Sequence, residues 1–155
     1  MRIALQSAAA GAVLLAGLCA AQPPNMTGTW HLNVEKSKWG AVNKPHSVVL
    51  TIVHNEPQIT YHGAVVYANE DDRTFGFSGA FDKKPYPMSR SFGDGEIVLS
   101  RLDPYTFESV FRAADGVTVE TTKTVISRDG RTMTRQIRLS SQEGTKKWTE
   151  VYEKK

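Results

Sequence analysis

Apolar and polar residues alternate along most of the chain after residue 47, which is the pattern of half-buried β-strands. Phe107 and Phe111, for example, have the opposite parity from Glu108 and Arg112, so a strand would place the two rings on one face. We expect about nine strands and no long amphipathic helix. The clearest runs cover residues 48–53, 59–67, 75–81, 97–102, 105–112, 117–127, 132–140 and 146–153.

Turn signals separate these runs at short, near-regular intervals. Asp115-Gly116 and Asp129-Gly130 lie between alternating segments, which is a strong hairpin signal, and Glu143-Gly144 leads into the last segment. The rhythm predicts an antiparallel meander that closes into an up-and-down β-barrel of about 8–10 strands, or a sandwich. Closure is the favoured outcome because it leaves no strand edge exposed. One helical turn is expected over residues 34–39.

The first 21 residues have the pattern of a secretory signal peptide. Arg2 is the only charged residue before Glu35, and the segment that follows it is mostly apolar or small. We expect cleavage near Ala20 or Ala21 and export to the periplasm or the cell exterior. A lipid attached to Cys19 is the alternative, although Leu18 stands where a small residue is usual.

Composition and charge narrow the remaining possibilities. The length predicts one domain over residues 22–155, and Cys19 is the only cysteine, so no disulfide framework is expected. The formal charge of +3 is dispersed, without a basic block interleaved with aromatic residues, which argues against nucleic acid as a partner. We expect a monomer with no membrane span.

Both ends of the predicted domain resemble calycins, the group of lipocalins and fatty-acid-binding proteins. Gly28-Thr29-Trp30 is similar to the Gly-x-Trp of their first strand, and the segment 149–154, Thr-Glu-Val-Tyr-Glu-Lys, is similar to their closing strand. The chain also resembles a group of short exported bacterial proteins of unassigned function. The resemblance implies a calycin-like barrel whose first and last strands meet.

Two departures from fatty-acid-binding proteins bear on the ligand. Only residues 40–47 separate Trp39 from the next predicted strand, so the helical lid of those proteins is missing. Their closing strand carries an arginine that receives a lipid carboxylate, and Glu150 stands at the matching position here. Tyr152 does match the tyrosine of that family.

The parity of the last strand predicts a polar anchor inside the barrel. If Tyr152 faces inward, so do Glu150 and Trp148, and a buried carboxylate needs a partner. A two-residue hairpin loop would bring Arg135 to Glu150, whereas a three-residue loop would bring Arg138. We favour Arg135 because its face is the more apolar. A structural ion pair that only fixes the register is the alternative.

Aromatic residues supply the other candidates. Trp30 is predicted to plug the closed end of the barrel under a basic side chain, as the matching lipocalin tryptophan does, and a pocket wall is the alternative. An aromatic stripe is expected either to form plain core or to line a ligand pocket. Its members are Phe75, Phe77, Phe81, Tyr105, Phe107 and Phe111.

Three functions follow from these patterns. The first is binding of a small, mostly apolar molecule by Phe107, Phe111 and the Arg135–Glu150–Tyr152 group beside Trp148. The second is a solid barrel that works as a structural or interaction module through an exposed aromatic patch near Tyr86 or Trp39. The third is an enzyme with Glu150 as an unpaired acid.

Little in the sequence points to catalysis or to a cofactor. The four histidines, His31, His46, His54 and His62, do not have metal-ligand spacing. No Gly-x-Ser-x-Gly elbow, phosphate-binding loop or dinucleotide fingerprint occurs. We therefore expect no catalytic residue, metal or cofactor.

N-terminal sequencing of the protein purified from its host tests the export prediction. The mature chain should begin at Ala21 or Gln22, because signal peptidase cleaves after a small-residue site. A start at a lipid-modified Cys19 would instead establish the lipoprotein alternative.

Overall fold

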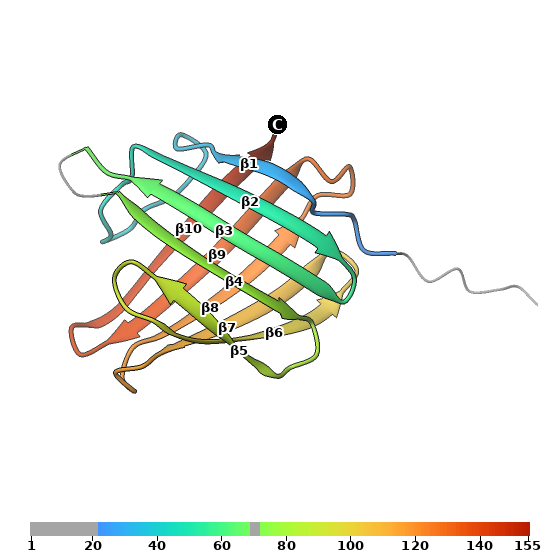
Figure 1. Cartoon of the computed structure of the whole chain (residues 1–155). Coiled ribbons are helices and arrows are strands. Elements are labelled where there is room, and N and C mark those ends of the chain that lie inside the picture. The colour runs from blue at the N-terminus through green and yellow to red at the C-terminus, as the bar shows by residue number, and fades with distance from the viewer. Residues whose placement is uncertain (1–21, 69–71) are drawn as a thin grey trace, which may run out of the picture.

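The chain folds into a closed up-and-down barrel (Figure 1), seen in a computed structural model that describes residues 22–68 and 72–155. Each strand pairs antiparallel with its neighbours in sequence, and β1 (Gly28–Leu32) closes the barrel against both β2 (Ser47–Asn55) and β10 (Gly144–Lys154). This confirms the all-β barrel and excludes the sandwich. The other strands are β3 (Gln58–Val66), β4 (Arg73–Ala80), β5 (Pro85–Arg90), β6 (Gly95–Asp103), β7 (Thr106–Ala113), β8 (Val119–Ile126) and β9 (Thr132–Ser141).

The strand that the sequence pattern missed is β5. Pro85 and Pro87 lie within it, and proline cannot donate a ladder hydrogen bond, so the segment reads as a turn. The structure nevertheless pairs β5 with β4 through three residue pairs, from Phe75↔Arg90 to Phe77↔Met88. β5 carries Arg90 into the barrel interior, where its side chain is 7% exposed.

The helical turn predicted over residues 34–39 is wrong. Residues 34–36 form a hydrogen-bonded turn, in which the Lys36 N–H donates to Asn33 Oδ1 at 3.0 Å and the Ser37 hydroxyl donates to Asn33 O at 2.7 Å. Lys38 then exchanges two backbone hydrogen bonds with Thr149, each 2.8 Å long. This bridge holds the chain extended against β10, which competes with helix formation.

The predicted signal peptide, with Cys19 and the cleavage site, lies outside the described residues. Within the described ranges, no helix has the length and apolar character that crossing a membrane requires.

The solid part of the core lies at the barrel end where the N-terminal segment enters (Figure 1). Met26, Trp30, Ile52, Ile126 and Met133 are almost completely shielded from solvent there. The Trp30 indole N–H donates to the Met26 carbonyl at 2.9 Å, and the Lys154 ammonium lies 5.4 Å from the centre of the Trp30 ring. Trp30 therefore has both its apolar surface and its polar N–H satisfied by neighbouring residues.

Trp30→Ala should lower the free energy of unfolding by about 3–5 kcal/mol, the usual cost of truncating a buried aromatic residue. Urea denaturation measures the change. Trp39→Ala is the matched control, since Trp39 is partly exposed in the β1–β2 loop and should cost less. A Trp30→Ala variant as stable as the wild-type protein would mean that Trp30 does not hold this end of the core together.

Candidate functional site

The other end of the barrel is hollow. An inner hollow of about 140 Å³ lies among the strands, and an outer hollow of about 720 Å³ opens at the mouth. The two adjoin, since Phe75, Phe111 and Trp148 line both. The loops β1–β2, β5–β6, β7–β8 and β9–β10 form the rim of the outer hollow, so its opening lies opposite the Trp30 end.

The structure brings the predicted site residues together around these hollows. Phe107 and Phe111 are buried, at 4% and 3% exposure, and both line the inner hollow. Tyr152 lines the outer hollow, and Trp30 lines neither of the two. The inner hollow is also lined by Arg135, Trp148 and Glu150.

The Arg135–Glu150 pair forms through the two-residue loop between β9 and β10. Gly144 pairs with Ser141, and this register sets Glu150 directly opposite Arg135. The Arg135 guanidinium donates to Glu150 Oε2 at 3.0 Å, and both side chains are about nine-tenths shielded from solvent. Arg138, the alternative partner, stands opposite Lys147 in the register of the two strands.

Two further donors complete the coordination of Glu150. The Trp148 indole N–H donates to Oε1 at 2.8 Å, and the Tyr152 hydroxyl donates to Oε2 at 2.8 Å. Three side chains thus stabilise one buried carboxylate, which is the arrangement that a charge inside a protein requires. An enzyme that uses Glu150 as an unpaired acid would need this carboxylate without a cationic partner. Arg135 is such a partner, so this requirement is not met.

A second buried ion pair was not predicted. The Arg90 guanidinium lies 3.2 Å from Glu120 Oε2, with side-chain exposures of 7% and 16%, and its carbon lies 3.5 Å from the centre of the Phe111 ring. Arg90 was not predicted as an inward-facing residue because the prolines of β5 obscure the strand pattern. Glu120 was not predicted because the inward face of β8 is not the apolar one: Thr124 is buried and points inward, while Val125 is exposed.

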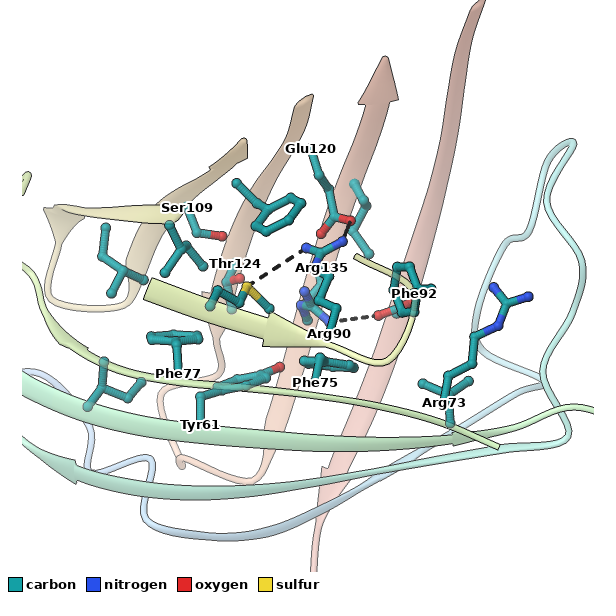
Figure 2. A pocket seen from close by; sticks show the side chains of 18 of the residues that line it. Tyr61, Arg73, Phe75, Phe77, Arg90, Phe92, Ser109, Glu120, Thr124 and Arg135 are labelled. Carbon is teal, nitrogen blue, oxygen red and sulfur yellow. Dashed lines mark hydrogen bonds and ion pairs between the residues drawn. The ribbon is translucent and has the colours of Figure 1, made fainter. Parts of the chain in front are cut away.

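Stacked aromatic rings make up the wall that faces these ion pairs (Figure 2). The Tyr61 ring stacks on Phe75 at 6.0 Å and on Phe77 at 5.6 Å between ring centres. Gly63 makes the first contact possible, because a Cβ at that position would collide with the Phe75 ring. Tyr61 escaped prediction, although it shares the inward parity of Ile59 on the same strand.

Burial controls the electrostatics of this site. Burial raises the pKa of Tyr61 to about 12. It also raises the pKa of Tyr152 well above the usual range, with Glu150 adding to the shift. Burial by itself would lower the pKa of Arg135, but the nearby Tyr61 and Glu150 outweigh it and the net shift is upward. At neutral pH both phenols are therefore protonated and the guanidinium is charged.

The remaining members of the aromatic stripe lie towards the closed end. Phe81 packs edge-on against Phe107, with ring centres 5.1 Å apart, and Tyr105 belongs to the β6–β7 turn. His54 also lies there, where its Nδ1 accepts from the Met26 N–H at 3.3 Å and its Nε2 contacts Glu56 at 2.6 Å. In the part of the chain that the structure describes, no three His, Cys, Asp or Glu residues gather as metal ligands.

Comparison of the chain with protein-family models and with curated proteins finds no match.

A double-mutant cycle tests whether Arg135 and Glu150 act as one buried pair. Glu150→Gln leaves the arginine without its counter-charge and should cost about 3–5 kcal/mol of stability. Adding Arg135→Met should recover much of that loss, because the uncompensated charge is gone. Additive effects in denaturant unfolding would mean that the two groups are energetically independent.

The shifted tyrosines predict a pH dependence of stability at the alkaline end. A phenol in the unfolded chain ionises near pH 10, whereas Tyr61 in the folded protein ionises at about 12. Unfolding therefore releases a proton between these values, so the stability that Tyr61 contributes is complete below pH 10 and is lost as pH rises towards 12.

Denaturant unfolding at several pH values measures this loss, which Tyr61→Phe should reduce. Ultraviolet titration of the folded protein should show phenols that ionise late. Ionisation of every tyrosine near pH 10 in the folded state would contradict the burial of Tyr61 and Tyr152.

Proposed function

We propose that this protein binds a small, mostly apolar molecule inside the barrel, in the manner of a lipocalin or fatty-acid-binding protein. The observation that carries the proposal is the pair of adjoining hollows, which lead from the mouth to the aromatic wall of Tyr61, Phe75 and Phe77. The outer hollow, at about 720 Å³, falls within the roughly 300–1,000 Å³ range of ligand sites.

The composition of the walls supports the same function. Ligand sites are mostly apolar with a few placed polar groups, and here rings and aliphatic side chains surround two ion pairs. Phe107 and Phe111 form apolar wall, while Arg135, Trp148, Glu150 and Tyr152 form a polar group that orients the ligand. No chemical step is part of the proposal.

The proposed setting follows from the N-terminal sequence. The protein acts in the periplasm or outside the cell after residues 1–21 are removed. We also propose that it acts as a monomer. The terminal resemblance to calycins is in keeping with a binding role, because the closed barrel brings the two similar segments together in one sheet.

Titration with Nile red, an uncharged dye that brightens in apolar surroundings, tests the proposal. The purified protein should give a saturable rise in fluorescence with one site per chain. Ser109→Phe should abolish it, since Ser109 lines the inner hollow and the larger ring would fill that space.

Ser78→Phe is the matched control, because Ser78 lies exposed on β4 and makes the same change outside the barrel. It should leave the titration unchanged. A wild-type protein that does not bind the dye, or a Ser109→Phe variant that binds it equally, would refute binding within the barrel.

A further inference from the structure

The carboxylates inside the barrel are already occupied by donors of the protein itself. Glu150 accepts hydrogen bonds from Arg135, Trp148 and Tyr152. Glu120 accepts from Arg90 at 3.2 Å, and its other oxygen lies 3.5 Å from the Thr122 hydroxyl. A ligand that offered hydrogen-bond donors would therefore compete with bonds that exist.

Two hydrogen-bond donors on the walls of the inner hollow, in contrast, are not used. The Tyr61 hydroxyl and Arg90 Nε are both buried without a hydrogen-bond partner among the described residues, and both residues line the inner hollow. Tyr61 comes from β3 and Arg90 from β5, on either side of β4, and Figure 2 labels both beside this hollow. Buried polar groups in native proteins are nearly always bonded, so two unmatched donors on one hollow indicate that an acceptor belongs there.

The charges inside the barrel constrain the nature of that acceptor. Arg90 and Arg135 are balanced by Glu120 and Glu150, so these four side chains sum to zero. A carboxylate ligand would add a buried negative charge beside two glutamates, with each guanidinium already paired, which is costly. Arg73 also lines both hollows but lies apart from these four in Figure 2, with its guanidinium carbon 5.1 Å from the centre of the Tyr67 ring and 5.5 Å from that of Phe92.

The size of the inner hollow limits what can reach the two donors. It measures about 140 Å³, and an apolar cavity of about 150 Å³ can hold benzene. The near-parallel rings of Tyr61 and Phe77, tilted by 14°, make one side of it aromatic, which suits a planar aromatic group. A ring with a short polar substituent matches this space, and the rest of a larger molecule would extend into the outer hollow.

We propose that the ligand is an uncharged molecule that presents a hydrogen-bond acceptor, such as a ketone or ester carbonyl, to the Tyr61 hydroxyl and Arg90 Nε. This inference rests on the proposed binding function and specifies its ligand class. It assigns Tyr61 and Arg90 as the residues that select an uncharged acceptor over a free carboxylic acid.

Three probes of similar shape test the inference by isothermal titration calorimetry at neutral pH. Methyl 2-naphthoate offers an uncharged acceptor, 2-naphthoate offers a carboxylate, and 2-ethylnaphthalene offers no acceptor. The ester should bind at least about tenfold tighter than the carboxylate, because only the anion buries an unmatched charge. It should bind roughly 2- to 10-fold tighter than the hydrocarbon, the value of one hydrogen bond.

Tyr61→Phe isolates the hydroxyl. It should weaken ester binding by roughly 2- to 10-fold and leave 2-ethylnaphthalene binding unchanged. Because that hydroxyl has no partner in the part of the chain that the structure describes, its removal should preserve the fold. Tyr86→Phe is the matched control, since the Tyr86 hydroxyl donates to Asp82 on the surface at 2.8 Å, and it should change neither affinity. The Arg90 Nε–H resonance in NMR spectra should shift with the ester.

The outcomes separate this inference from the proposed function. If the carboxylate binds as tightly as the ester, or if Tyr61→Phe has no effect on ester binding, the inference is wrong while binding within the barrel stands. If Nile red binds and none of the three probes does, the inference is again wrong. If neither the dye nor any probe binds, the proposed function itself fails.

Discussion

Closure of the barrel depends on β1, a strand of five residues that pairs with β2 on one side and β10 on the other. Without it, both neighbouring strands would expose an edge of unpaired backbone groups. Trp30 lies in this strand, opposite Leu50 and Lys154, and it packs the closed end from there. At the far end, the side chains of the ten strands do not fill the interior, and the barrel stays hollow there.

The ion pairs inside the barrel differ in what they connect. Arg135 and Glu150 are cross-strand neighbours in β9 and β10, whereas Arg90 and Glu120 reach across the interior from β5 and β8. Burying such pairs is rarely the most stable solution, since apolar replacements of similar volume are often as good or better. A role in orienting a bound molecule gives a reason for charges to be retained at this position, in keeping with the proposed function.

Local patterns predicted the half of the site that lies within one hairpin. Side-chain parity along residues 146–153 aligned Trp148 with Tyr152, and the more apolar face favoured Arg135 over Arg138 as the partner of Glu150, as the structure has it. The other half failed for identifiable reasons. The prolines of β5 break the pattern of a strand, so the strand that carries Arg90 was not predicted. The inward face of β8 carries threonines, so the inward orientation of Glu120 was not predicted either.

The sequence by itself determined the all-β class and the meander and favoured the register of the last hairpin, because alternation and tight turns act between residues that are neighbours along the chain or across one loop. Only the tertiary structure decided that Tyr61, Arg90 and Glu120 face the same hollow as Arg135. Contacts across a barrel depend on strand number, tilt and stagger around the whole sheet. No local pattern encodes that geometry, and so the volume of the interior and its unmatched donors emerge only when the barrel closes.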